Sequence, residues 1–355
     1  LDKAKECLYE TISLDSKFTL AYYSLSRFSN IKKDEVLFDN LFKININEIK
    51  SIKDKINILF AKSNVLHKRK FYNESSKFLK EANNLKLSIR KSSADQLIEI
   101  ANDNLIKTKG LKSGKKIISN NNQECIFIVG MPRSGSTLIE SILNTNKNVL
   151  DLGERPLIEM SLKKILNKKR NSEDYRTFYK FYLEERSKFI KSNSITTDKY
   201  LYNYLYLGYI LHSFPNAKVI HCFRNPLDNI LSIYKANFFD GVRFSSSIED
   251  CARVYIDHIK TIKEYQNRFP SEIYPLNYDL LVTNSDIEIR ELIKWLKWKW
   301  NDAYLYPENT NRNIKTASVI QARSPINPKS LGGWEKYRDL LKPARKLLRE
   351  NDLID

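Results

Sequence analysis

The sequence contains few cysteines, and they are not placed to form a metal site or a disulfide framework. The four cysteines lie far apart, with no Cys-x-x-Cys pair and no histidine ligand set nearby. Cys125 and Cys222 flank or lie within apolar runs that predict buried strands, where a free cysteine acts as a small hydrophobic side chain. This usage excludes a zinc ribbon, suggests no metal, and fits the reducing cytoplasm in which we expect the protein.

Long hydrophobic stretches are also absent. No apolar run approaches the roughly 18 residues of a membrane-spanning helix, so we expect no membrane span. The sequence begins at Leu1 and not at a methionine, so the lack of a signal peptide carries no information. With 42% hydrophobic and 29% charged residues, the 355-residue chain has a globular composition and enough length for two domains.

A net charge of +18 favours an anionic partner. The lysines are spread over many segments, without one dense basic tail, so we do not expect general nucleic-acid binding. A basic pocket for a nucleotide with several negative charges is a sufficient reason for the excess of positive charge.

Residues 1–110 show helical spacing and no strand signal. Two stretches resemble tetratricopeptide repeats, and their small residues Thr11 and Ala82 lie about two repeat periods apart. We expect an α-helical repeat-like domain over 1–110 and a polar linker over 111–122. The helices either dock a protein partner or only cap the next domain, and the sequence leaves both open.

From residue 123 to 355 the pattern alternates strand and helix, which predicts an α/β domain with a parallel sheet flanked by helices. The expected strands are 126–129, 148–153, 194–198, 217–223 and 273–276. The expected helices are 157–166, 175–189, 200–211, 227–238, 247–267 and 286–298. Ligands bind beyond the carboxyl ends of such strands. We therefore expect four charged residues that directly follow strands to meet at one edge: Arg133, Glu154, Lys199 and Arg224.

The glycine loop after the first strand is typical of a phosphate or sulfate site. Gly130 and Gly135 have the spacing of a nucleotide-triphosphatase loop, and Thr137 takes the position of its metal-binding hydroxyl. The lysine of that loop is replaced by Ser136, and the basic residue stands inside the loop as Arg133. Backbone amides and a helix start still converge on one anion. The loop thus argues against ordinary ATP or GTP hydrolysis.

A second strand-turn-helix segment covers residues 219–232. Arg224 ends its strand, Pro226 suits the first helical turn, and Ser232 lies two turns further on. An arginine fork and a hydroxyl in this arrangement can hold a phosphate monoester. Alone, the segment is better explained by Arg224 capping the helix or pairing with Asp228.

Taken together, the two segments resemble a known family. The string Pro132, Arg133, Ser134, Gly135, Ser136, Thr137 resembles the 5′-phosphosulfate loop of sulfotransferases that use 3′-phosphoadenosine 5′-phosphosulfate (PAPS), and 219–232 resembles their 3′-phosphate element. The other markers look most like the tyrosylprotein branch, in particular bacterial sulfotransferases with N-terminal tetratricopeptide repeats. The resemblance implies sulfuryl transfer from PAPS to a hydroxyl acceptor on a P-loop-type domain, with 3′,5′-adenosine bisphosphate as product and no metal.

The resemblance also implies roles for single residues. Glu154 corresponds to the catalytic base, and Lys199 to the lysine that steadies the transition state. Tyr278 corresponds to a tyrosine that contacts the nucleotide, and Ser318 to a serine beside the sulfuryl group. The nucleotide-covering loop would further contribute Arg323 and Trp334. Independently of the family, transfer of a charged group requires fixed cations and N–H donors, which Arg133, Lys199 and the loop amides supply.

The acceptor is left open: a tyrosine of a peptide, a saccharide hydroxyl or a small molecule. Two other functions compete with sulfuryl transfer. A nucleotide-dependent kinase would require magnesium and a P-loop lysine, against which Ser136 counts. A repeat-mediated adaptor with a degenerate nucleotide pocket would bind without catalysis.

Overall fold

A computed structural model describes residues 2–28, 35–112, 124–167, 175–190, 195–238, 241–310 and 323–355. The chain forms two compact units, which we describe separately. Unit 1 comprises Leu1–Asp95, Ile230–Val254 and Gly332–Asp355, and unit 2 comprises Gln96–Asn229 and Tyr255–Leu331. The linker expected over 111–122 lies outside the described residues from residue 113 onward, and the boundaries of the two expected domains remain predictions.

Unit 2 is built on a five-stranded sheet in the order β2-β3-β1-β4-β5, with every neighbouring pair parallel. The strands are β1 (Cys125–Gly130), β2 (Val149–Asp151), β3 (Ile195–Asp198), β4 (Ala217–Phe223) and β5 (Ile273–Asn277). Each strand overlaps a segment expected to be a strand, and in β1 and β4 the reason is burial on both faces, which needs apolar side chains on both. The α/β fold class is confirmed.

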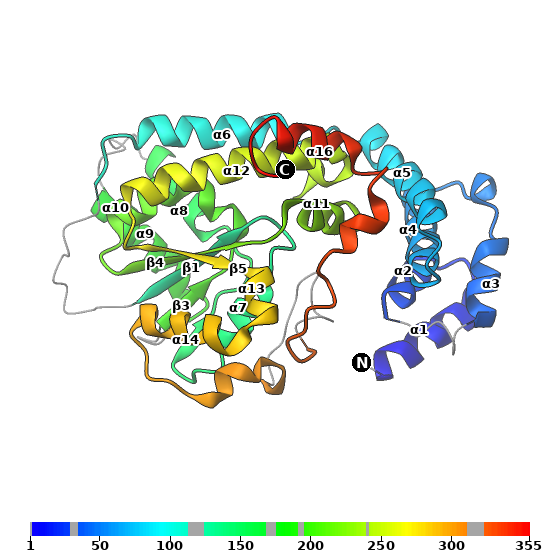
Figure 1. Cartoon of the computed structure of the whole chain (residues 1–355), viewed down its shortest axis with the longest axis horizontal. Helices are drawn as coiled ribbons and strands as arrows, with labels where there is room; N and C mark the ends of the chain where they lie inside the picture. The colour runs from blue at the N-terminus through cyan, green and yellow to red at the C-terminus, as the bar shows by residue number, and fades with distance from the viewer. Residues whose placement is uncertain are drawn as a thin grey trace. The chain divides into compact units, whose positions relative to one another are not determined.

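Helices cover both faces of this sheet, as Figure 1 shows. Helices of unit 2 are α7 (Ser136–Leu143), α8 (Leu157–Asn167), α9 (Tyr175–Ser187), α10 (Leu207–Ser213), α13 (Tyr278–Thr283) and α14 (Ser285–Leu296). Shorter 3-10 helices are η3 (Leu201–Tyr206), η5 (Asp302–Leu305) and η6 (Pro307–Asn309). Three further helices run from one unit into the other: α6 (Ala94–Lys107), α11 (Pro226–Tyr234) and α12 (Ile248–Arg268).

The central strand β1 shows how the two faces are filled. Phe127 and Val129 point into the core formed with α8, α9, α10 and α12, whereas Ile126 and Ile128 point into the core formed with α7 and α14. All four side chains are fully buried, which contributes about 1.5–3 kcal/mol each. The alternation fixes the strand's register and holds its carboxyl end in place.

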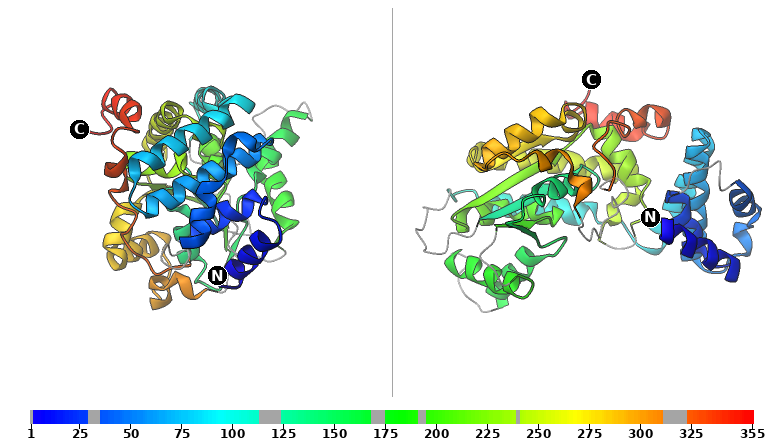
Figure 2. Two further views of the ribbon diagram at one scale, coloured as in Figure 1. Left: turned by 90° about the vertical axis from the view of Figure 1, so that its right-hand side faces the viewer. Right: turned by 90° about the horizontal axis from the view of Figure 1, so that it is seen from below.

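Unit 1 contains the N-terminal helices, which confirms the helical character predicted for this part of the chain. They are α1 (Asp2–Leu14), α2 (Thr19–Phe28), α3 (Glu35–Lys43), η2 (Ile46–Glu48), α4 (Ile52–Lys68) and α5 (Tyr72–Ile89). Later segments add η4 (Arg243–Ser246), η7 (Gly333–Tyr337) and α16 (Lys342–Arg349). Figure 2 shows α4 and α5 (blue to cyan) side by side, where small residues let them approach: the Ser63 and Ser75 hydroxyls lie 2.8 Å apart. Their assignment to tetratricopeptide repeats remains a prediction.

The helix expected over 200–211 is divided in the structure. Residues 201–206 form the tighter 3-10 helix η3, and only from Leu207 does the α-helix α10 begin. The Asn203 N–H bonds to the carbonyl of Tyr200, three residues back, and the Asn203 side chain donates to Asp198. Such local side-chain bonds compete with the α-helical ladder.

The structure gives one finding on the membrane question. Among the helices it describes, none combines the length and the apolar character needed to span a bilayer.

Candidate active site

The site lies at the carboxyl edge of the sheet. Since all five strands are parallel, the segments that follow them leave from the same edge. Gly130, the last residue of β1, is in register with Cys222 of β4, so the loops after these two strands start side by side. The segments that follow the five strands carry the candidate residues, and the parallel sheet starts all of them from this one edge.

The loop after β1 has a tightly constrained backbone. A Cβ on Gly130 would lie 2.3 Å from the Cys222 carbonyl oxygen, so only glycine fits. Gly135 has a φ of +100°, and a Cβ there would lie 2.3 Å from the ring of Tyr278. Arg133 adopts a φ of +68°, which costs a non-glycine residue about 1–3 kcal/mol and is typical of ligand-binding loops.

This loop presents hydrogen-bond donors. Helix α7 begins at Ser136 without a side-chain hydrogen bond to its first turn, which leaves N–H groups available at its N-terminus. The Ser134 side chain is buried, and its Oγ has no hydrogen-bond partner among the described residues. Leaving such a hydroxyl unsatisfied costs about 1–3 kcal/mol, so an anionic ligand oxygen fits here. The residues present therefore fit a bound sulfate or phosphate group.

Lys199, directly after β3, is a fully buried cation. Its Nζ donates a 2.5 Å hydrogen bond to Glu154 Oε1, which comes from the segment after β2. A second carboxylate, Glu140 on α7, places Oε2 3.8 Å from the same Nζ. The Glu154 side chain is 45% exposed, whereas Glu140 is fully buried. Glu154 thus lies between Lys199 and solvent.

Asp198 anchors the turn that presents Lys199. Its carboxylate accepts hydrogen bonds from the Tyr182 hydroxyl at 3.2 Å, the Asn203 amide at 2.9 Å and the Tyr200 N–H at 3.3 Å. Burial raises the pKa of Asp198 to about 7, although these three donors lower it. The site therefore contains a carboxyl group that titrates near neutral pH.

Arg224, directly after β4, is almost fully buried. Its Nη2 donates to the Ser330 carbonyl at 2.9 Å, and the guanidinium lies 4.9 Å from the centre of the Tyr278 ring. The expected pair with Asp228 exists at 3.8 Å, and Asp279 lies at 3.9 Å. The Arg224 Nε is buried and makes no hydrogen bond within the described part of the chain. Apart from the 3.9 Å ion pair with Asp279, the hydrogen-bonding capacity of this nitrogen is thus left for another group.

Tyr278 connects the loops after β1 and β4. Its ring contacts Gly135 on one side and the Arg224 guanidinium on the other, and its hydroxyl lies 3.0 Å from Ser330 Oγ. It follows β5 directly, where Asn277 caps helix α13. The tyrosine is therefore held by rigid elements between these two loops.

Four further residues were singled out by the sequence. Ser318 lies outside the described residues, and Arg323 is exposed. Ser232 and Trp334 belong to unit 1, where Trp334 packs against the guanidinium groups of Arg338 and Arg345. The roles suggested for these four residues remain predictions.

Sequence reasoning assigned no role to Glu140. The only signal was one charged residue among the apolar side chains of the helix after the glycine loop. His221 on β4 is buried with its Nε2 3.0 Å from that of His258, and burial lowers the pKa of His221 to about 3. Within the described ranges, no group of three or more His, Cys, Asp or Glu side chains is arranged to hold a metal.

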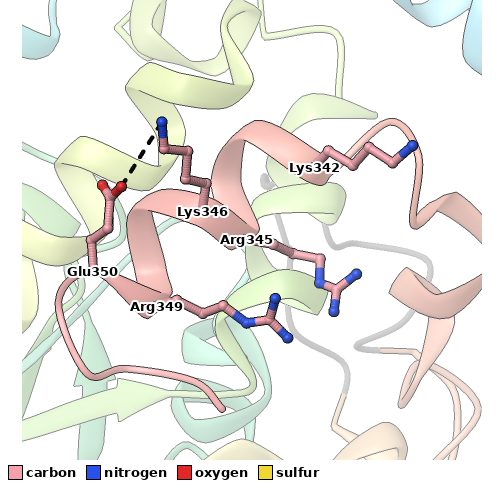
Figure 3. A pocket seen from close by; sticks show the side chains of 5 residues that line it. All are labelled: Lys342, Arg345, Lys346, Arg349 and Glu350. Atoms are coloured by element: carbon pink, nitrogen blue, oxygen red, sulfur yellow. Dashed lines mark ion pairs between the residues drawn. The ribbon is translucent and has the colours of Figure 1, made fainter.

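Unit 1 contains a separate basic hollow on α16. Figure 3 shows its lining, and its volume is about 290 Å³. The lining residues are Lys342, Arg345, Lys346, Arg349 and Glu350. None of the candidate site residues lines it, so the hollow is not part of the site at the sheet edge.

Comparisons with known proteins place the chain in a family. The profile of the sulfotransferase family matches residues 125–302, half of the chain. An uncharacterised protein of Aquifex aeolicus is 30% identical over 315 residues, covering 82% of this chain and 41% of that protein, so this chain corresponds to less than half of that relative. Protein-tyrosine sulfotransferase 1 of Danio rerio is 25% identical over 249 residues, covering 63% of this chain and 70% of that enzyme.

Solved structures with a similar arrangement are also sulfotransferases. The sulfotransferase domain of the olefin synthase from Synechococcus PCC 7002 is 16% identical with a TM-score of 0.48, covering 66% of this chain and 98% of that domain. Mouse sulfotransferase SULT7A1, complexed with PAP, is 13% identical with a TM-score of 0.41, covering 70% of this chain and 90% of that enzyme. By the profile match over half of its length, the chain belongs to the sulfotransferase family.

Proposed function

We propose that this protein transfers a sulfuryl group from PAPS to a hydroxyl acceptor. One observation carries the proposal: the strained glycine loop, with a buried Ser134 hydroxyl that makes no hydrogen bond, lies beside Arg224, whose Nε also makes no hydrogen bond among the described residues, on the same sheet edge as the Lys199–Glu154 pair. Two sets of anion donors and an acid–base pair are what a sulfated nucleotide and its acceptor require.

The donor nucleotide would be held by residues of both loops. Residues 132–137 would bind the 5′-phosphosulfate through backbone amides and the Ser134 hydroxyl. Arg224 would bind the 3′-phosphate through its Nε, which makes no hydrogen bond among the described residues, and the Tyr278 ring would hold the guanidinium in place. By family resemblance, Ser232, Arg323 and Trp334 would complete the nucleotide site, and Ser318 would contact the sulfuryl group.

The catalytic residues would have two tasks: to remove the proton of the acceptor hydroxyl and to stabilise the negative charge of the transferred group. When bound, PAPS supplies the sulfuryl group and a phosphate leaving group. Glu154 accepts the proton of the acceptor hydroxyl as the new O–S bond forms, and its 45% exposure allows an acceptor to reach it. Lys199 and Arg133 stabilise negative charge on the transferred group and on the leaving oxygen. Lys199 is effective because it is buried, where a charge is weakly screened.

The finer identity of the acceptor is part of the proposal. The relative from Danio rerio is named a protein-tyrosine sulfotransferase, which makes a tyrosine in a peptide the first acceptor to test. Saccharide hydroxyls and small molecules follow. Helices α1 and α2 would belong to successive tetratricopeptide-like repeats and α4 and α5 to another, and these helices would either dock a protein partner or cap the next domain.

The direct test is a binding titration with 3′,5′-adenosine bisphosphate in the absence of magnesium, followed by transfer of radiolabelled sulfate to the three acceptor classes. We expect metal-free binding and label transfer to at least one class. Binding without transfer would favour the adaptor. Binding that requires magnesium, or nucleotide triphosphate turnover, would favour the kinase and refute the proposal.

Glu154→Gln tests the assigned base. The substitution keeps a hydrogen bond to Lys199 but cannot accept a proton, so kcat should fall by roughly 10²–10⁴-fold while affinity for the bisphosphate persists. Glu291→Gln is a matched control, because Glu291 pairs with exposed Lys294 on α14, a helix that carries none of the candidate site residues. A kcat for Glu154→Gln close to that of the control would remove Glu154 from the mechanism.

A further inference from the structure

Lys199 has two carboxylate partners, and the proposed function uses only one. Glu154 is hydrogen-bonded to Nζ at 2.5 Å, whereas Glu140 lies 3.8 Å away and is fully buried. We propose that Glu140 is a positioning residue, the permanent counter-ion that keeps the Lys199 ammonium paired and in place while Glu154 takes the acceptor's proton. The catalytic part of this inference rests on the proposed function.

The argument starts from the cost of burying a charge. An ammonium group without water needs an opposite charge close by, and removing that charge is strongly unfavourable. In the resting protein Glu154 fulfils this need at short range. Once Glu154 has accepted the acceptor's proton, it is neutral and no longer balances Lys199. Among the described residues, Glu140 is the other carboxylate within 4 Å of Nζ, so it is the group of the protein that still balances the charge, whether or not a nucleotide is bound.

The position of Glu140 in the fold suits this role. It lies on α7, four residues after Ser136, so the glycine loop and Glu140 belong to one continuous rigid segment. Lys199 follows β3, the strand that pairs with β1 directly before that loop. A carboxylate on α7 therefore fixes Lys199 relative to the loop that would hold the sulfuryl group. Glu140 is inaccessible to solvent and to an acceptor, so it cannot replace Glu154 as the base.

The first experiment needs no ligand and measures thermal unfolding of the full chain. Glu140→Gln and Glu154→Gln each leave Lys199 with one carboxylate, so each should lower Tm only slightly. The double variant leaves the ammonium without a counter-charge, and its loss in Tm should clearly exceed the sum of the two single losses. Adding Lys199→Met removes the charge and should restore most of the loss, even if the double variant itself does not fold.

The control is Glu185→Gln in the Glu154→Gln background. Glu185 is also buried, but it pairs with Lys164 and Lys188, so its effect should add to that of Glu154→Gln without an excess. Additive losses for Glu140→Gln with Glu154→Gln would overturn the proposal. Failure of Lys199→Met to restore Tm would also overturn it, since Glu140 would then act independently of Lys199.

The second experiment measures turnover with PAPS and a working acceptor. Glu140→Gln should lower kcat by about 10- to 100-fold and leave the KM for PAPS unchanged. In a Lys199→Met background the same substitution should cause no further loss in kcat. An equal loss in both backgrounds would show that Glu140 does not act through Lys199. If the wild-type protein transfers no sulfate, the proposed function fails, but the unfolding experiment still decides the role of Glu140.

Discussion

Among the individual residues of the site, Asp198 makes a specific prediction about pH. Its pKa is about 7 in the folded protein because of burial, against an ordinary value of 3.8. Between these values the folded state binds a proton that the unfolded state has released, so stability should fall as pH rises from 4 to 7 and then level off. The whole span amounts to about 4 kcal/mol at most.

Asp198→Asn should remove this pH dependence. The amide oxygen can still accept from Asn203 and Tyr200, while the Tyr182 hydroxyl can reorient to accept from the amide. The measurement is denaturant unfolding at pH 5, 6, 7 and 8 for both proteins. Asp257, whose pKa burial raises to about 6, stays in both, so only their difference reports on Asp198. Equal slopes in the two proteins would contradict the assignment.

Gly135 makes a second prediction at the same scale. In Gly135→Ala the new Cβ meets the Tyr278 ring at 2.3 Å, and the residue must also keep a φ of +100°. Since the ring is held by Arg224 and Ser330, it cannot yield freely. We expect bisphosphate affinity to fall at least 10-fold, measured by calorimetric titration.

The matched control for this variant is Gly241→Ala. Gly241 has a φ of +83° with nothing within 4 Å of the new Cβ, so it has the backbone strain without the clash. It should lose stability but keep nucleotide affinity. Equal affinity losses in the two variants would indicate that the contact between Gly135 and Tyr278 does not shape the site.

At the scale of single elements, helix α11 links secondary structure to the site. Asn225 Oδ1 accepts from the N–H groups of Leu227 and Asp228, and so caps the helix directly after Arg224. Its own N–H donates to Asp279 at 2.6 Å. Asn225→Ala should therefore cost about 1 kcal/mol of stability and also loosen the Arg224 backbone, with weaker bisphosphate binding.

Ser51→Ala provides the comparison for the cap. Ser51 caps α4 in unit 1 through a bond from the Asp54 N–H, and its loss should cost a similar amount of stability. Nucleotide affinity should be unchanged in this variant. If both variants bind equally well, the cap of α11 supports the fold but not the site.

The elements show which parts of the structure a sequence pattern can predict. Strands β1 and β4 were predictable because they are largely apolar runs buried between two helical layers, whereas β3 is mostly polar and was predicted from its place in the alternation of strands and helices. Helix α13 (Tyr278–Thr283) was missed because it is shorter than any clear helical periodicity, and its only signal is the Asn277 cap. The division of 200–211 was missed because it depends on a bond between Asn203 and Asp198.

The site shows the same distinction. The glycine loop and the residues directly after strands were predictable, because a parallel sheet places the ends of its strands at one edge. The burial of Glu140 beside Lys199 was not, because one charged residue on a short helix carries no sign of which side chain it will meet. An ion pair between a helix and the segment after a strand, such as Glu140 with Lys199, depends on packing distances that only a structure provides.

At the scale of the whole molecule, packing joins segments that are far apart in the sequence. In unit 1, the Tyr337 hydroxyl lies 2.8 Å from His67 Nδ1 and 3.0 Å from Ser75 Oγ. No local pattern at 337 indicates such partners, because tertiary contacts depend on the complete fold. The sequence therefore predicted the helical character of the N-terminal part, but not which segments from later in the chain pack against it.

The net charge of the chain gives the last prediction. With an excess of 18 positive charges, the field around the protein should attract an anionic nucleotide, and added salt should weaken that attraction. Because the screening length falls from about 10 Å at 0.1 M to 3 Å at 1 M salt, affinity for 3′,5′-adenosine bisphosphate should decrease steadily over this range. The slope of log affinity against log salt concentration should be steeper for the bisphosphate than for adenosine 5′-monophosphate, which carries less charge.

Titrations of both nucleotides at several salt concentrations measure these slopes, and Tm at each concentration controls for effects on the fold. Arg224→Ala should bring the bisphosphate slope close to that of the monophosphate, because the 3′-phosphate would lose the cation proposed to bind it. Equal slopes for the two nucleotides in the wild-type protein would mean that salt acts on the protein and not on the ligand's charge. A bisphosphate slope unchanged in Arg224→Ala would place the 3′-phosphate elsewhere.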